Sequence, residues 1–199
     1  METGFIITII SMLLFVVLAT YDGIYLHLIK YRLHVHPESK FEHMVHTARA
    51  ILFPLILYFL YLSDALVFFY IGLAWVFLDI LTVAVDAYAE GDSRKFMGGL
   101  PRWEYILHLF VNGFHFASIA VFLALKIQIG ENQLEIVTDF ESISTYPAFE
   151  WLIKNLIPGA ALMGILHVAL NFNQPQQTWD RLLGRFSVLR PARQKEAIK

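Results

Sequence analysis

Long apolar stretches separated by shorter polar connections run along the whole chain. Five of them reach the length of about 20 residues that a helix needs to cross the hydrocarbon core of a bilayer. They cover residues 5–31, 44–63, 65–88, 103–127 and 148–171. The pattern therefore predicts an all-α integral membrane protein, folded as a single domain over residues 1–199, with five transmembrane helices in a bundle.

The connections between these stretches differ in character. A tight turn near Ser63 and Asp64 joins the second stretch to the third, which predicts a helical hairpin. Residues 90–102, EGDSRKFMGGLPR, combine glycine, proline and charge and are typical of a loop. The acidic segment 130–147 is unlike the rest, and its LEIVTDF sequence indicates a short strand or a piece lying at the membrane surface.

Lysine and arginine alternate between the connections, which predicts the orientation of the bundle because cytoplasmic loops carry an excess of both. The connections after the first, third and fifth stretches are basic; they contain Lys30, Arg32, Lys40, Arg94, Lys95, Arg102, Arg181, Arg185, Arg190, Arg193, Lys195 and Lys199. The turn after the second has neither residue, and the connection after the fourth is acidic. We expect an outside N-terminus and a cytoplasmic C-terminus in a bacterial-type inner, or cytoplasmic, membrane.

The C-terminal tail contains a candidate interfacial helix at residues 178–187. Its apolar face consists of Trp179, Leu182, Leu183 and Phe186. Arg181 and Arg185 lie on other faces, and this separation is typical of a helix in the plane of the membrane surface. We expect this helix to rest on the cytoplasmic leaflet.

Composition agrees with a membrane protein and restricts its chemistry. Hydrophobic residues make up 57% of the chain and charged residues 16%, whereas about a quarter of the residues of soluble domains are charged. The absence of cysteine excludes disulfides, iron–sulfur clusters and thiolate metal sites. We expect the membrane, and no nucleic acid, as a partner of the chain.

Ionisable residues inside the apolar stretches are costly to place in lipid, so each is a candidate functional residue. They lie near the C-terminal ends of the first, third and fifth stretches and the N-terminal ends of the second and fourth. In helices of alternating direction, a rise of ~1.5 Å per residue brings them to depths of about 4–15 Å from one boundary. The sequence thus predicts one polar site near the cytoplasmic face.

Histidine and carboxylate without thiolate suit zinc, iron or manganese, so we expect a metal centre. The candidate ligands are His27, His46, His108, His115, His167, Asp22, Asp79 and Glu104. Their number exceeds what one zinc ion needs and favours a dinuclear site, or one metal with further residues that orient its ligands. We expect His46, His108 and His167 to share a metal. Asp79, Glu42 and Arg49 are the candidate catalytic residues.

Helical spacing supports part of this set. Glu42, His46 and Arg49 follow one face, and a second stripe contains Glu104, His108, Asn112 and His115. Asp22 and His27 are five residues apart and do not share a face of an α-helix neatly. We expect Arg49 to pair with Asp79 or Asp22. The histidines outside the set, at positions 34, 36 and 43, are expected to be solvated or to face lipid headgroups.

These features predict a membrane-embedded metalloenzyme that acts on a lipid or other apolar substrate. With iron, most simply two ions, it would be an oxidoreductase carrying out O₂-dependent oxidation or hydroxylation with a redox partner. With zinc it would be a hydrolase, in which a carboxylate serves as general base for a metal-activated water. The alternatives are a haem b, quinone-linked electron-transfer subunit, a proton-relay protein, and a structural subunit, which would leave the convergence of polar residues unexplained.

Overall fold

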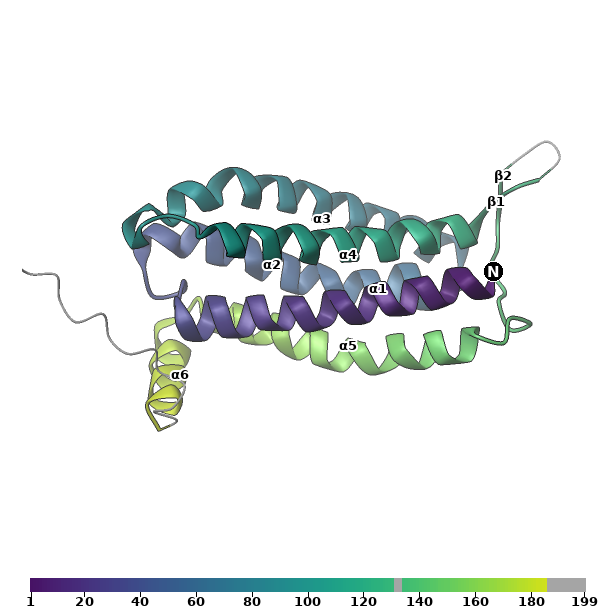
Figure 1. Cartoon of the computed structure of the whole chain (residues 1–199). Coiled ribbons are helices and arrows are strands. Elements are labelled where there is room, and N and C mark those ends of the chain that lie inside the picture. The colour runs from purple at the N-terminus through teal and green to yellow at the C-terminus, as the bar shows by residue number, and fades with distance from the viewer. Residues whose placement is uncertain (131–133, 186–199) are drawn as a thin grey trace, which may run out of the picture.

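The computed structural model describes residues 1–130 and 134–185, most of which are helical (Figure 1). The helices of the bundle, with the π-helical and 3₁₀ segments that extend or join them, are α1 (Glu2–Thr20), η1 (Tyr21–Lys30), η2 (Pro37–Ser39), α2 (Lys40–Ile56), η3 (Leu57–Leu62), α3 (Leu66–Ser93), η4 (Lys95–Met97), α4 (Arg102–Lys126) and α5 (Tyr146–Ala169). The remaining elements are α6 (Asn173–Arg185) and a hairpin of β1 (Ile127–Ile129) and β2 (Leu134–Ile136).

Five helical runs are long and apolar enough to cross a membrane, which confirms the predicted all-α bundle at this level. They are Glu2–Lys30, Pro37–Leu62, Leu66–Ser93, Arg102–Lys126 and Tyr146–Ala169. Each contains most of one predicted stretch. Regular hydrogen bonding along a helix satisfies the backbone without water, which is why such apolar segments become helices.

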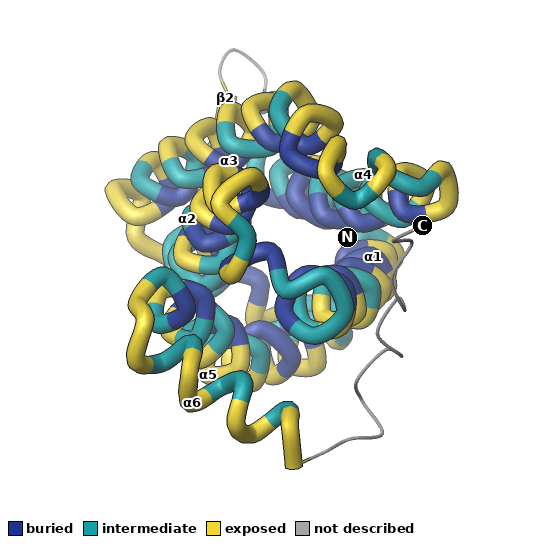
Figure 2. The backbone as a smooth tube through the Cα atoms, turned by 90° about the vertical axis from the view of Figure 1, so that its left-hand side faces the viewer, coloured by how far each residue is buried: buried dark blue, intermediate teal, exposed yellow. Residues whose placement is uncertain are grey.

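The five long helices lie side by side with their axes roughly aligned (Figure 1). α1 packs against α4 and α5, and α2 packs against α3 and α5. The view along the bundle shows buried residues turned inward and exposed ones outward (Figure 2). Many large apolar side chains remain on the outer surface, among them Val17, Phe77, Ile80, Trp151 and Ile165. An apolar surface of this extent suits lipid rather than water.

Two close backbone approaches hold the neighbouring helices together. A Cβ at Gly72 of α3 would lie 2.8 Å from the backbone of Leu60, and one at Gly164 of α5 would lie 3.0 Å from the carbonyl oxygen of Ala50. Small residues that let helices approach are the usual way to gain packing energy where lipid replaces water. α2 is therefore fixed against both α3 and α5.

α3 is longer than the sequence pattern indicates, and this corrects the predicted loop at 90–102. The helix continues to Ser93, because Glu90 and Ser93 are buried and bonded to other helices. The chain then turns through Gly98 and Gly99, whose φ angles of 93° and 91° lie in the left-handed region that favours glycine. The loop before α4 is thus confined to the residues after Ser93.

The end of the bundle that carries the β-hairpin has an aromatic core. β1 and β2 are antiparallel, with Ile127 opposite Ile136, so the strand predicted within LEIVTDF is present. The rings beneath the hairpin belong to Phe5, Tyr61, Phe122, Phe140, Tyr146 and Phe149. The ring centroid of Phe5 lies 5.2 Å from that of Phe140 and 5.1 Å from that of Phe149. Such spacings are typical of attractive aromatic pairs.

α6 lies at the opposite end of the bundle and points away from the axes of the long helices (Figure 1). It begins before the predicted interfacial helix at 178–187, of which residues 186 and 187 lie outside the described part of the chain. The indole nitrogen of Trp179 donates to the carbonyl oxygen of Leu28 at 3.4 Å, and Asp180 pairs with Arg32. These contacts attach α6 to the end of η1.

Candidate metal centre

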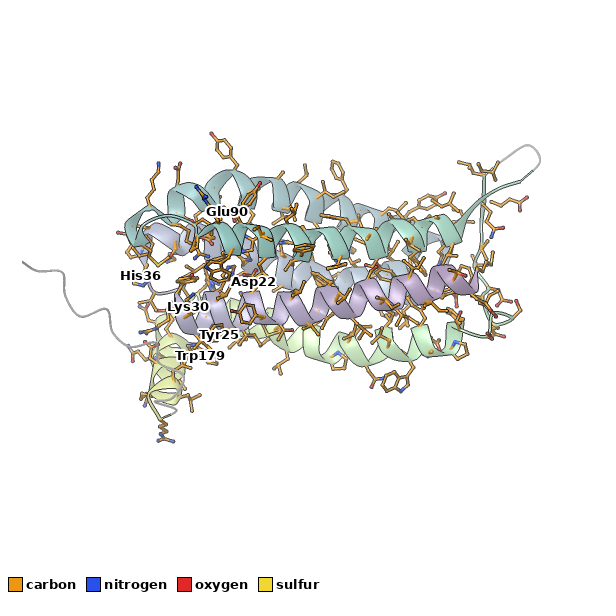
Figure 3. All side chains as sticks on the ribbon, viewed as in Figure 1. Asp22, Tyr25, Lys30, His36, Glu90 and Trp179 are labelled. Carbon is orange, nitrogen blue, oxygen red and sulfur yellow. The ribbon has the colours of Figure 1, made fainter. Side chains whose placement is uncertain are left out.

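Polar and ionisable side chains gather at the α6 end of the bundle. Asp22 on η1 and Glu90 on α3 lie at this end, as do Lys30, His36 and Trp179 (Figure 3). Each of the five long helical runs contributes buried ionisable residues here, from alternating ends of successive helices. The structure therefore brings the predicted set to one end of the bundle.

The π-helical segment η1 determines how Asp22 and His27 meet. Their five-residue spacing is poorly matched to an α-helix, but i→i+5 bonding places residues five apart above one another. The Nε2 atom of His27 lies 3.4 Å from Oδ1 of Asp22. The expectation that these residues do not share a face is thus wrong, because it assumed α-helical geometry. π-helical segments are rare and occur frequently at functional sites.

Asp22, His27 and His108 form a first group of possible metal ligands. One ligand atom from each lies within 4.8 Å of the others. Nε2 of His108 is 3.2 Å from Oδ1 of Asp22, and its Nδ1 is 2.9 Å from Oε2 of Glu90. A carboxylate on the second nitrogen of a ligating imidazole fixes its tautomer and orientation, so Glu90 is placed to support His108 as a ligand.

A second group consists of His27, Glu42 and His46, and it shares His27 with the first. Its ligand atoms also lie within 4.8 Å of one another, and the ring centroids of His27 and His46 are 4.0 Å apart. Among the described residues, neither ring nitrogen of His27 has a hydrogen-bond partner, although its side chain is 1% exposed. Nε2 of His46 is also unpartnered and lies 3.4 Å from Oδ2 of Asp86. Buried imidazole nitrogens without partners have the capacity to bind a metal ion.

Arg94 binds the carboxylate of Glu42 from the end of α3. Its Nε lies 2.9 Å from both oxygens of Glu42, its Nη2 lies 3.1 Å from Oε1 of Glu104, and Ser93 donates to Glu42. All four side chains are buried. Burial alone would lower the pKa of the Arg94 guanidinium, but the hydrogen bond and charge of Glu42 outweigh it and raise that pKa above its usual range. This arginine therefore keeps two buried acids compensated.

Asp79, His115 and Arg49 form a separate group deeper in the bundle. Nε2 of His115 lies 3.0 Å from Oδ2 of Asp79, and Nε of Arg49 lies 3.4 Å from Oδ1 of the same carboxylate. Arg49 also donates to the side-chain oxygen of Asn112 at 2.8 Å. The predicted pairing of Arg49 with Asp79 is confirmed. Both oxygens of Asp79 have partners within this group, which is outside the two candidate ligand groups.

His167 lies in a third cluster, with His43 and His34 rather than with His46 and His108. Its ring stacks on His43 at a centroid distance of 5.5 Å, and His34 follows at 5.7 Å from His43. The expectation that His34 and His43 are solvated or face lipid headgroups is wrong, because both are buried where the segment after η1 folds under α2. Burial, with a smaller effect of the neighbouring His43, lowers the pKa of His34 to about 4. His36 is half-buried against the ring of Phe96.

The structure thus places the predicted ligands in several separate clusters. Asp22, His27, His46 and His108 come together with Glu42, whereas Asp79, His115, His167 and Glu104 lie in neighbouring contacts. Glu90 and Arg94 were missed, since they fall in the predicted loop. The sequence does contain a feature that indicates Glu90: position 90 follows Asp86 by one helical turn and so continues the face of Asp79 and Asp86.

Comparison of the chain with models of known protein families, with curated proteins and with solved structures gives no match. The chemistry of the site therefore has to be argued from the donor atoms themselves. Imidazole and carboxylate donors at mutual distances below 4.8 Å, buried among apolar helices, are a set that zinc, iron or manganese would accept.

Proposed function

We propose that this chain is a membrane-embedded metalloenzyme whose metal centre is built on Asp22, His27, Glu42, His46 and His108. The observation that carries the proposal is the pair of three-ligand groups that share His27 inside an apolar bundle. Buried carboxylates and imidazoles in a membrane must be paired, coordinated or neutralised. Arg94 already compensates Glu42, so a bound cation would compensate Asp22 and use the unpartnered nitrogens of His27 and His46.

The composition of the groups favours a catalytic over a structural site. Three protein ligands leave a coordination position open, which is the usual arrangement where a metal activates water or substrate. Two groups that share one histidine can hold one ion, with the remaining residues orienting its ligands. They could hold two ions if His27 lost its ring N–H proton and bound one ion through each nitrogen. With iron the centre would support O₂-dependent oxidation or hydroxylation; with zinc it would support hydrolysis. The surrounding apolar surface favours a lipid or another apolar substrate.

We also propose that the α6 end of the bundle faces the cytoplasm. This end carries the basic residues Lys30, Arg32, Lys40, Arg94, Lys95, Arg102, Arg181 and Arg185. The hairpin end carries Glu135, Asp139 and Glu141. An excess of lysine and arginine marks cytoplasmic loops, and α6 would then rest at the cytoplasmic leaflet of an inner membrane.

Elemental analysis of the purified protein, read beside its optical spectrum, tests the proposal. We expect iron, zinc or manganese at about one or two ions per chain, with most of it lost in His27→Ala and His108→Ala. His115→Ala is the matched control. His115 lies on α4, as His108 does, but it is paired with Asp79 and belongs to neither ligand group. A Soret band would support the haem b alternative instead. Metal-free protein whose melting temperature is unaffected by added zinc, iron or manganese would refute the proposal.

A proton relay is the second candidate, and the chain Asp22–His108–Glu90 favours it. One imidazole contacts a carboxylate through each nitrogen, which is the arrangement through which protons move. Proton flux into liposomes that contain the protein, measured with a trapped pH indicator, tests this function. If the wild-type protein conducts protons and His108→Ala does not, the result supports a relay. If the flux with wild-type protein is no greater than in protein-free liposomes, a relay is excluded.

A further inference from the structure

A cavity of about 170 Å³ lies between α3 and α4, beside the proposed metal centre. Its apolar lining consists of Val83, Ala87, Tyr105 and Leu109. Tyr105 and Leu109 are 60% and 64% exposed, and Ala87 is also exposed. All four residues belong to the two membrane-spanning candidates α3 and α4, so the cavity is reached from the side of the bundle that would face lipid.

The inner wall of the cavity is polar and leads to the metal centre. It consists of Asp86, Glu90, His108 and Asn112. His108 belongs to the first ligand group and lies 3.2 Å from Asp22, while Glu90 supports its other nitrogen. A molecule in this cavity would therefore contact one ligand of the proposed centre directly.

The inner wall also indicates which chemical group would be accepted. Asp86 is 7% exposed, and its Oδ1 atom has no hydrogen-bond partner among the described residues. A buried acceptor without a donor is destabilising. A ligand that donates to the Asp86 carboxylate, after rotation of the carboxylate brings Oδ1 to the cavity, would remove that cost. Two carboxylates in one small wall would repel an anionic head such as a phosphate or a fatty-acid carboxylate.

We infer that this cavity binds the polar end of a single-chain membrane amphiphile with a hydrogen-bond donor, a hydroxyl or an amine, entering from lipid between α3 and α4. Complete small-molecule sites occupy roughly 300–1,000 Å³, so a cavity of about 170 Å³ takes the head and first part of the chain and leaves the tail in the bilayer. The inference deepens the proposed function, on which it rests for the role of the bound molecule as substrate.

Photolabelling in liposomes tests this binding site. The probe is a long-chain primary alcohol with an alkyl diazirine next to its head, which forms esters with carboxylates on illumination. Peptide mass spectrometry then locates the adducts. We expect Asp86 and Glu90, each 7% exposed, to be labelled about tenfold or more above Glu42, which is 1% exposed and does not line the cavity. Unlabelled alcohol should compete about tenfold better than the fatty acid of the same length.

Ala87→Trp should fill the cavity and reduce the labelling of Asp86 and Glu90 about tenfold, at unchanged metal content. Ala84→Trp is the matched control, because this alanine is exposed on the same helix but does not line the cavity. Leu109→Trp provides a second blocked variant should the first fail to fold. Labelling equal to that of Glu42, labelling unaffected by both blocked variants, or better competition by the fatty acid would each overturn the inference. Labelling as expected in protein that binds none of the added zinc, iron or manganese would refute the metal centre and leave the amphiphile site standing.

Discussion

The same long helices enclose the interior at both ends of the bundle, yet the buried side chains differ between the two ends. The hairpin end is filled by rings such as Phe5, Phe122 and Phe149, which are at most 1% exposed. The α6 end is filled by acids, imidazoles and Arg94; Arg94 is 1% exposed, and Asp86 and Glu90 are 7% exposed. Aromatic packing stabilises a bundle without further partners, whereas buried charge in a membrane is tolerated only with compensation and is rarely present without a function.

α4 shows the change from one kind of interior to the other along a single helix. Glu104, His108 and His115 face the polar end, whereas Phe122 joins the aromatic cluster. Ser118 lies between them, donating to the carbonyl oxygen of His115 and accepting from Tyr61 at 3.0 Å. The polar interior therefore ends within one helical turn, beyond which the described interior is mainly apolar.

The largest expected effect comes from removing the compensation at the polar end. Arg94→Leu leaves the carboxylates of Glu42 and Glu104 buried without their cation, and should lower the free energy of unfolding by about 3–5 kcal/mol. Denaturant or thermal unfolding in detergent measures the change.

The neighbouring Lys95→Leu is the control for this variant. Lys95 pairs with Asp92 at an exposed site, where the loss should be about 1 kcal/mol or less. Equal stability of the two variants would show that the polar end does not depend on Arg94, and the contrast between the two ends would lose its main support.

A smaller loss is expected at the aromatic end. Phe149→Ala removes a ring that is 0% exposed. In a bundle surrounded by lipid, as proposed, the change should cost about 3 kcal/mol, the lower end of the usual range. Trp151→Ala, at a side chain that is 66% exposed, should change stability little. Metal content should stay at the wild-type level in both variants. A loss of metal in Phe149→Ala at unchanged stability would contradict the separation of the two ends.

The smallest effect concerns His34, which lies outside the five helical runs that are long and apolar enough to span a membrane. Burial lowers its pKa from 6.5 to about 4, so the unfolded chain binds more protons than the folded chain between these two values. Its contribution to stability is complete above about pH 6.5 and declines as the pH falls toward about 4. The melting temperature should therefore drop over this range, and His34→Asn should reduce the drop. His36→Asn is the control, because His36 is only half-buried. If the melting temperature of His34→Asn drops as much as that of the wild-type protein, the burial of His34 is not the cause of the drop.

The local pattern of apolar and polar residues was enough to predict the helices and their inward faces, but not the details of the site. Apolar runs of sufficient length predicted the five helices, and α-helical spacing placed His46 and His108 on interior faces. The approach of Asp22 to His27 depends on the π-helical turn of η1, which a periodicity of 3.6 residues conceals. The burial of His34 and His43 depends on how the connection after η1 folds, which is a tertiary effect.

The most direct test of the central claim is a titration of metal-free protein with Co²⁺, followed through the visible absorption bands that report its coordination. The structure predicts saturable bands typical of nitrogen and oxygen ligands, lost in His27→Ala because both ligand groups contain this residue, and retained in His115→Ala. Bands of equal strength in the two variants, or no bands in the wild-type protein, would contradict a metal centre at the polar end of the bundle.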